Sequence, residues 1–350
     1  MLTRNPKTRK SLRLRAGELV EVRSREEILQ SLAGNATLDG LPFMPEMLKF
    51  SGKRHLVFKR VEKVCGNFEN TGYIFRRMEN VVLLEGVRCD GEAHAGCQAA
   101  CMILWKEAWL KRVSPDQTAK SAPAILTRHG ESSLPACATG CTEASLLEGA
   151  RKCTGSPGVD DETFVCQLTE LKCATSPLAW WDVRAYWRDL RSGNVSAWQW
   201  VRGMLIAFFN AVQGIRKGVL YPHFEPGTLK KTPSETLNLR PGDVVEVKSK
   251  DEISQTLDWL NRNRGLYFDM EMLKYCGRRF KVCGRVGKVI NDRTGKILNL
   301  GTESIILEDV ICNGDCHLFC PRSEFIYWRE IWLRRVCVSL LPEGHCDNET

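Results

Sequence analysis

Two stretches of the chain repeat the same order of hydrophobic and polar positions. Each opens with a glycine turn, at Gly17 or Gly242, and continues with β-branched residues that alternate with polar ones. This alternation is typical of a half-buried strand that follows a turn. A serine, Ser24 or Ser249, then precedes a glutamate by three positions, and this capping-box spacing predicts a short helix.

Further strand-like segments follow in both stretches. They cover residues 54–64 and 81–87 in the first stretch and residues 279–290 and 304–310 in the second. Each stretch ends with the motif Trp-Lys/Arg-Glu-x-Trp-Leu, whose alternation favours a strand, although the spacing of its two tryptophans also fits a helix. Four or five short strands with one helix predict an α+β fold in which each stretch forms a small SH3-like β-barrel.

The two stretches are copies of one module. Residues 11–65 and 236–290 align without a gap, and 26 of the 55 aligned positions are identical. After a two-residue change in length the register resumes, so that VLLEGVRCDGEAHAGC aligns with IILEDVICNGDCHLFC. Identity at this level along one register indicates an internal duplication. We expect repeat module 1 over residues 11–113 and repeat module 2 over residues 236–337.

Two segments of different character separate the modules. Residues 114–162 are rich in Ser, Thr, Ala, Gly and Pro, which predicts a linker or long loop. Residues 163–235 contain a tryptophan-rich part followed by an apolar spacing near 3.6 residues, which predicts a helical segment. Its apolar core is too short to span a bilayer. We expect residues 180–217 to bind a protein partner, with a peripheral membrane contact as the alternative.

The composition changes this picture mainly through its cysteines. Apolar residues at 43% and charged residues at 26% are ordinary for a globular protein and exclude a disordered chain. The first 15 residues are basic and hold no apolar run like that of a secretory signal, which favours a cytoplasmic protein. In a reducing compartment the 16 cysteines are expected to act as metal ligands or catalytic groups rather than as disulfides.

Each module carries cysteine and histidine residues at one shared register. Thiolates and imidazoles at spacings of three to eight residues can converge on one metal ion where a turn, at Gly91 or Gly314, folds the chain back. The expected metal ligands of module 1 are Cys65, Cys89, Cys97 and Cys101, with His94 as a ligand or as a donor that orients one. The expected metal ligands of module 2 are Cys312, His317 and Cys320, completed by Cys316.

One resemblance to a known family bears on the metal. The string Cys-Asp-Gly-x2-His resembles the motif of the CDGSH iron–sulfur family, in which three cysteines and one histidine hold a two-iron cluster, and this implies an iron–sulfur cluster as the alternative cofactor. Here one more residue separates Gly91 from His94, and no Cys-x-Cys pair lies just upstream, so we expect zinc.

With its RCDG-x2-H-x2-C-x3-C and W-[KR]-E-x-W-L motifs, most of the chain resembles an uncharacterised bacterial family of hypothetical proteins. This second resemblance implies no activity.

Common catalytic motifs are missing from the sequence. It has no phosphate-binding loop, dinucleotide fingerprint, His-Glu-x2-His zinc motif or serine nucleophile elbow. Glu107 and Glu330 lie between tryptophans, where we expect salt bridges to neighbouring strands rather than acid–base chemistry. The sequence therefore predicts a metal-binding accessory or interaction protein. An iron–sulfur redox protein or enzyme is the first alternative, and a nucleic-acid-binding protein, supported by a net charge of +8, is the second.

Overall fold

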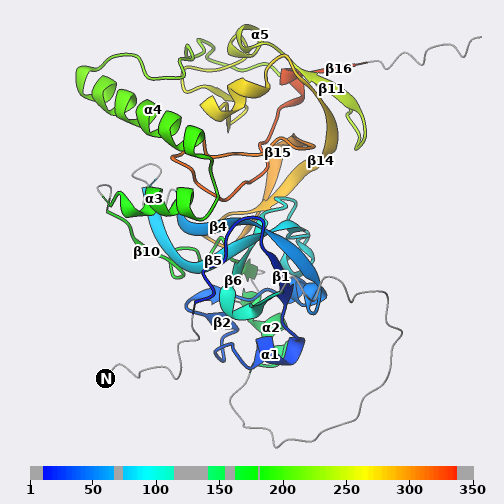
Figure 1. Ribbon diagram of the computed structural model, residues 1–350. Helices are drawn as coiled ribbons and strands as arrows, with labels where there is room; N and C mark the ends of the chain where they lie inside the picture. The colour runs from blue at the N-terminus through cyan, green and yellow to red at the C-terminus, as the bar shows by residue number, and fades with distance from the viewer. Residues whose placement is uncertain (1–10, 67–73, 114–140, 154–161, 180–181, 337–350) are drawn as a thin grey trace, which may run out of the picture. The chain divides into compact units, whose positions relative to one another are not determined.

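The computed structural model describes residues 11–66, 74–113, 141–153, 162–179 and 182–336, and Figure 1 shows them as a coloured ribbon. The fold is a mixed α+β arrangement whose sheets are antiparallel. The described residues divide into two compact units. Unit 1 contains those within 1–221, 288–300 and 312–324, and unit 2 contains those within 222–287, 301–311 and 325–350.

Unit 1 is built on a six-stranded sheet. Its strands are β1 (Leu19–Val22), β4 (Arg54–Gly66), β5 (Ile74–Arg88), β6 (Met102–Lys106), β7 (Leu110–Arg112) and β10 (Ser176–Pro177). The strand order is β10-β5-β4-β1-β7, and β6 also pairs with β5. The β4–β5 register shifts twice, between Val57 and Lys59 and between Val61 and Lys63. Such irregularities increase the local twist of a sheet, and here they lie in its two longest strands.

Short elements connect these strands and cover the sheet. They are α1 (Arg25–Leu29), β2 (Thr37–Leu38), β3 (Leu41–Pro42), α2 (Glu143–Gly149), β8 (Arg151–Cys153), β9 (Glu162–Phe164) and the 3₁₀ turns η1 (Pro45–Phe50), η2 (Glu92–His94) and η3 (Glu107–Trp109). The capping box at α1 forms as the spacing predicts, because Ser24 and Glu27 each accept the other's backbone N–H. The segment from 141 to 153, which we expected to be loop, contains α2 and β8.

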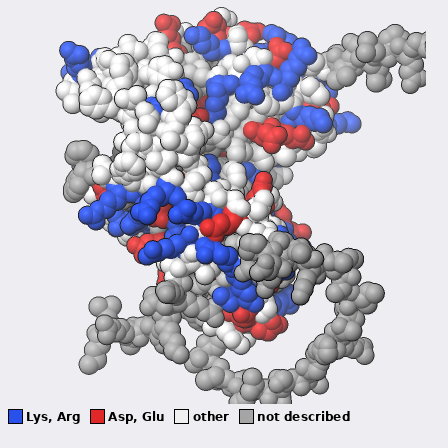
Figure 2. All heavy atoms as spheres, in the orientation of Figure 1, with Lys and Arg blue, Asp and Glu red and all other residues white. Residues whose placement is uncertain are grey.

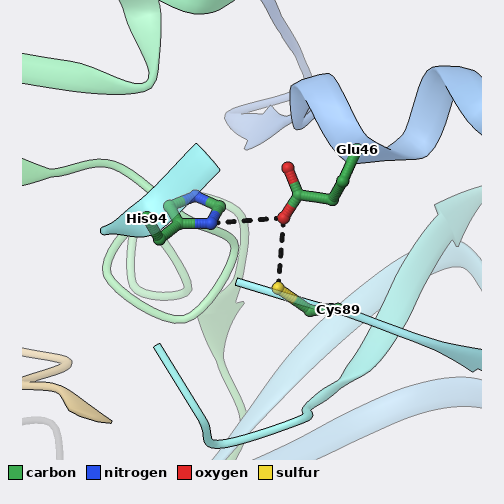
Figure 3. Close-up of side chains that lie close together, drawn as sticks. All are labelled: Glu46, Cys89 and His94. Atoms are coloured by element: carbon green, nitrogen blue, oxygen red, sulfur yellow. Dashed lines mark hydrogen bonds and ion pairs between the residues drawn. The ribbon is translucent and has the colours of Figure 1, made fainter. Parts of the chain in front are cut away.

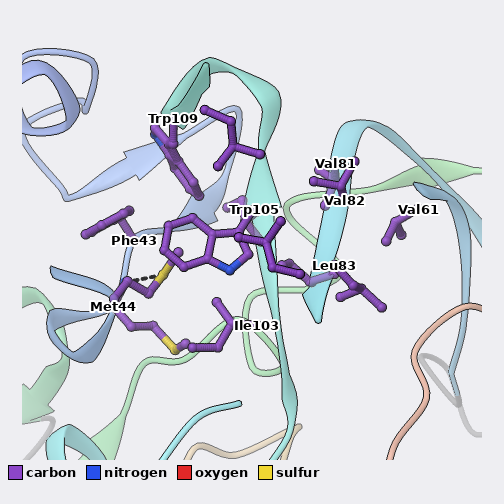
Figure 4. Packing of buried hydrophobic residues seen from close by; sticks show 14 of the residues in the cluster. Phe43, Met44, Val61, Val81, Val82, Leu83, Ile103, Trp105 and Trp109 are labelled. Carbon is purple, nitrogen blue, oxygen red and sulfur yellow. Dashed lines mark hydrogen bonds between the residues drawn. The ribbon is translucent and has the colours of Figure 1, made fainter. Parts of the chain in front are cut away.

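The Trp-Lys-Glu-x-Trp-Leu motif supplies the centre of the core of unit 1 (Figure 4). It is a strand interrupted by a 3₁₀ turn, so that Trp105 lies on β6 and Trp109 lies on η3. Both indoles are fully buried and pack edge-to-face on Phe43, with ring centroids 6.2 and 5.1 Å apart. Edge-to-face packing of this kind adds about 0.5–1.5 kcal/mol per pair to the gain from burial.

Two helices follow in unit 1. They are α3 (Arg184–Arg191) and α4 (Ala197–Arg216), and Ser196 caps α4 through the backbone N–H of Gln199. A salt bridge between Lys63 of β4 and Asp189, both fully buried, attaches α3 to the sheet. No helix in the described ranges is both long enough and apolar enough to cross a membrane.

Unit 2 is built on a smaller, four-stranded sheet. Its elements are β11 (Val244–Val247), α5 (Lys250–Ser254), β12 (Arg262–Asn263), β13 (Leu266–Tyr267), η5 (Met270–Tyr275), β14 (Arg279–Ile290), β15 (Ile297–Leu307), η6 (Glu330–Trp332) and β16 (Leu333–Arg335). The main sheet has the order β15-β14-β11-β16. Phe268 packs edge-to-face on Trp328 and Trp332, at 6.4 and 5.4 Å, as Phe43 does on the matching tryptophans of unit 1. The far ends of β14 and β15 belong to unit 1.

Candidate metal centre

The first Cys/His hairpin is shaped by Gly91. This glycine has a φ of 75°, and its carbonyl accepts the backbone N–H groups of His94 and Gly96 at 3.0 and 2.9 Å. A Cβ atom at position 91 would lie only 2.0 Å from the carbonyl oxygen of Cys97, so a side chain would open the turn. The Cys89 N–H donates to the carbonyl of Cys101 at 2.9 Å and closes the base of the hairpin.

The hairpin brings Cys89 and His94 against Glu46 of η1 (Figure 3). The ligand atoms of the three residues all lie within 4.8 Å of one another. The Cys89 thiol donates to Oε1 of Glu46 at 3.1 Å, and Nδ1 of His94 lies 3.2 Å from the same oxygen. His94 and Glu46 are buried, with 1% and 7% of their surfaces exposed. A carboxylate, a thiol and an imidazole therefore converge where water has little access.

Two polar atoms of this group are unsatisfied. Oε2 of Glu46 and Nδ1 of His94 are buried without a hydrogen-bond partner. Nδ1 lies close to Oε1 of Glu46, but the two atoms are not aligned for a hydrogen bond. Nε2 of His94 lies 3.2 Å from the carbonyl of Val165. If Nε2 carries the proton and donates it to that carbonyl, the Nδ1 lone pair faces the carboxylate. Two electron-rich atoms this close repel each other unless a proton or a cation lies between them. This is also how metal-ligating histidines are commonly oriented.

The electrostatics of the group follow from its burial. Burial opposes ionisation of Glu46, but the adjacent imidazole of His94 and the hydrogen bond from the Cys89 thiol outweigh it and lower the pKa of the carboxyl. Burial, with the nearby carboxylate of Glu46, raises the pKa of the Cys89 thiol. Without a metal, Cys89 is therefore a thiol at neutral pH, and a metal ion would have to displace its proton.

More thiols line a cavity of about 50 Å³ beside this group. The cysteine and histidine residues in its wall are Cys89, His94, Cys97, Cys101 and Cys166. Burial raises the pKa of Cys101 and raises that of Cys166 to about 11. The rest of the wall is mainly apolar and includes Met44, Leu104 and Ile290. The structure thus brings four of the five sequence-predicted ligands of module 1 to one cavity.

Two residues of this site were missed by sequence reasoning. Glu46 lies 43 positions before Cys89 and has no cysteine or histidine beside it; its signal was the glutamate shared by both copies, as Glu46 and Glu271. Cys166 lies in the segment between the modules. The neighbouring Gln167 fixes its position, because this amide donates to the carbonyl of Leu104 and accepts its N–H, both at 2.8 Å.

Cys65, the fifth predicted ligand of module 1, is not in the wall of that cavity. It lies near the end of β4, where its N–H donates to Sγ of Cys320 at 3.3 Å, and both residues are buried. Hydrogen bonding from the Cys65 thiol and the charge of Arg322 lower the pKa of Cys320, although burial opposes this. Of the other predicted ligands of module 2, Cys316 is exposed, whereas Cys312 and His317 are partly buried. No disulfide joins cysteines within the described ranges.

Glu107 and Glu330 serve as structural acceptors. Glu107 accepts the N–H groups of Leu12 and Leu14, both at 2.8 Å, and forms a salt bridge with Arg60. Glu330 accepts equivalent bonds from residues 237 and 239 and pairs with Arg285 at 2.7 Å. Burial would raise the pKa of each carboxyl, but these hydrogen bonds and charges lower it, as expected for a carboxylate held in an ion pair.

Helix α4 presents apolar side chains to solvent. None of its residues is buried. Its largest exposed apolar side chains are Trp198, Val201, Leu205, Phe208, Phe209 and Ile215. Figure 2 shows few charged side chains over α4 on the face toward the viewer. A partner that contacts residues 180–217 remains a prediction.

No protein-family model, curated protein or solved structure matches this chain.

Proposed function

We propose that this chain is a cytoplasmic zinc-binding accessory or interaction protein made of two SH3-like modules. The convergence of Glu46, Cys89 and His94, with two buried polar atoms left unsatisfied, is the observation that carries the proposal. A cation at this point would satisfy both atoms and offset the burial of a carboxylate.

The donor set favours zinc over other metals. Zinc accepts sulfur, nitrogen and oxygen donors in a tetrahedral site, whereas magnesium and calcium take oxygen donors. Three donors come from Glu46, Cys89 and His94, and a thiol in the cavity wall, from Cys97, Cys101 or Cys166, would complete four. A closed site with four protein ligands is typical of structural zinc, which contributes directly to the free energy of folding.

The experiment is metal analysis of the full chain purified without oxygen. We expect zinc in the wild-type protein, and loss of at least one equivalent in Cys89→Ala and in His94→Ala. Cys276→Ala is the matched control, because Cys276 is a partly buried cysteine of unit 2. Chelation should lower the thermal unfolding midpoint of the wild type. A metal-free wild type with an unchanged midpoint after chelation would overturn the proposal.

An iron–sulfur protein is the second candidate, and one observation favours it. Four cysteines, Cys89, Cys97, Cys101 and Cys166, line the same cavity, and thiolates are the common ligands of iron–sulfur clusters. In this case the same sample would contain iron and acid-labile sulfide and would absorb visible light. Zinc without iron or colour would exclude this candidate.

A further inference from the structure

The two Cys/His hairpins of unit 1 have the same backbone. In the second hairpin, Gly314 has a φ of 78°, and its carbonyl accepts the N–H groups of His317 and Phe319 at 3.1 and 2.9 Å. The Cys312 N–H donates to the carbonyl of Glu324 at 2.8 Å, as the Cys89 N–H does to Cys101 in the first hairpin. Each bond has its counterpart 223 positions earlier. The second hairpin therefore presents its cysteines and histidine on the same framework as the first.

Each hairpin contacts the long strand of the other sequence copy. In the first hairpin, Gln98 donates its N–H to the carbonyl of Lys288, at the end of β14, at 2.9 Å. In the second, Arg322 donates to the carbonyl of Cys65, near the end of β4, at 2.9 Å. All these residues lie in unit 1. The exchange is reciprocal, so a side chain at the end of one copy's strand belongs to the other copy's hairpin.

The residues exchanged in this way are Ile290 and Cys65, which share one register position at an offset of 225. Ile290 lines the cavity of the first hairpin, where Cys101 and Cys166 supply extra thiols. At the second hairpin the position of Cys101 is taken by Glu324, and the thiol comes instead from Cys65. Each hairpin thus has a cysteine sulfur beyond the pair that the two copies share, which is Cys89 and Cys97 or Cys312 and Cys320. This additional sulfur comes from a different part of the chain in the two hairpins.

Two buried thiols meet at the second hairpin, one from each sequence copy. Cys65 and Cys320 are 8% and 2% exposed and are directly hydrogen-bonded. The ammonium group of Lys59 is close enough to Cys312 and Cys320 for a charge–charge interaction with each of them. It also donates to Oγ of Ser323 at 3.0 Å. Arg322 adds a second positive charge close to Cys65 and Cys320.

We propose that Cys65 of the first copy, together with Cys312, His317 and Cys320 of the second copy, forms a second thiolate-rich zinc site in unit 1. The inference rests on the proposed zinc-binding function but assigns a separate site. Three cysteines and one histidine are a standard zinc donor set. On binding, Zn²⁺ replaces the S–H protons, which pass to the solvent, and no oxidant is required.

The test counts metal equivalents in the full chain under reducing, oxygen-free conditions, with Zn²⁺ for stoichiometry and Co²⁺ for the thiolate charge-transfer absorption. The wild type should bind two equivalents. Cys65→Ile, which copies the residue at the matching position, and Cys320→Ala should each lose one equivalent. Cys89→Ala should lose the other, and Cys65→Ile combined with Cys89→Ala should bind none.

The outcomes separate this inference from the proposed function. If Cys65→Ile and Cys320→Ala keep two equivalents while Cys89→Ala loses one, the first centre stands and the second assignment is wrong. If Cys65 instead serves the first centre, Cys65→Ile and Cys89→Ala will lose the same equivalent, and their combination will lose no more. A Cys65–Cys320 disulfide found by peptide mapping of the reduced preparation would also overturn the second site.

A gain-of-ligand variant keeps the test informative if a loss variant fails to fold. Ile290→Cys places a thiol at the first hairpin at the position that Cys65 occupies at the second. Because the strand ends are exchanged, we expect Ile290→Cys to add a thiolate to the first centre, the one that contains Cys89. The thiolate-to-cobalt absorption of that centre should therefore increase. An unchanged cobalt spectrum would contradict the reciprocal arrangement.

Discussion

Nδ1 of His94 lies 3.2 Å from Oε1 of Glu46, and both side chains are almost completely buried. The two residues are 48 positions apart, on η2 and η1. Nδ1 of the ring lies opposite the carboxylate without an aligned hydrogen bond between them. Such an arrangement is costly unless a positive charge lies between the two atoms. We therefore expect His94 to be needed for metal binding.

Replacing His94 with glutamine should weaken zinc binding by about 10-fold or more, because a ligand and its hydrogen bond to Val165 are both lost. Competition with a chromophoric chelator measures the affinity. His223→Gln is the control, since His223 is exposed. Equal affinities of the two variants would remove His94 from the site.

Zinc binding should release protons. The pKa of Cys89 is raised by burial, so its thiol is protonated at neutral pH and must lose its proton to bind. Log affinity should therefore rise with pH by about one unit per pH unit for each proton released. Calorimetry in buffers of different ionisation enthalpy counts these protons. Cys89→Ala should release fewer protons than the wild type, and an equal number would contradict Cys89 as a ligand.

Glu107→Gln should destabilise unit 1 by about 1–3 kcal/mol, because a buried carboxylate that accepts several N–H groups and pairs with Arg60 is lost. Urea unfolding followed by tryptophan fluorescence gives the free energy. Glu148→Gln, at an exposed position, is the control and should leave the free energy unchanged. A loss no larger than that of the control would show that the Glu107 contacts contribute little.

The same carboxyl predicts a pH dependence. The pKa of Glu107 is lower in the folded protein than its ordinary value. Its contribution to stability is therefore complete above the ordinary glutamate pKa and is lost as pH falls through the lower, folded-state value. The stability difference between the wild type and Glu107→Gln should shrink on acidification through this range. A difference that stays constant from neutral to strongly acid pH would exclude the linkage.

Burial separates the aromatic residues of unit 1 into two kinds. Trp105→Ala should cost about 3–5 kcal/mol, because the fully buried indole packs on Phe43 and Phe50. Phe208→Ser should change the free energy of unfolding by less than about 0.5 kcal/mol, because Phe208 on α4 is 71% exposed. Chemical denaturation of both variants tests the contrast. A large loss for Phe208→Ser would mean that α4 is covered in solution.

Much of the local structure could be read from the chain. The serine caps of α1 and α5, the alternating strands β1 and β11 and the turns at Gly91 and Gly314 depend on neighbours within a few residues. The Trp-Lys/Arg-Glu-x-Trp-Leu motif was harder, because a strand that changes into a 3₁₀ turn shows the spacing of both a strand and a helix.

The sequence by itself determined the internal similarity of the two stretches and the candidate ligands that lie within one hairpin, because both are relations between nearby or matching residues. Only the tertiary structure decided that Glu46 and Cys166 join Cys89, and that Cys65 contacts Cys320. Hydrophobic patterning specifies which face of a strand is buried, but not which distant segment will cover it. That choice depends on how the long strands β4 and β14 pack against the hairpins, so the contact of Cys65 with Cys320 could not be predicted from the sequence.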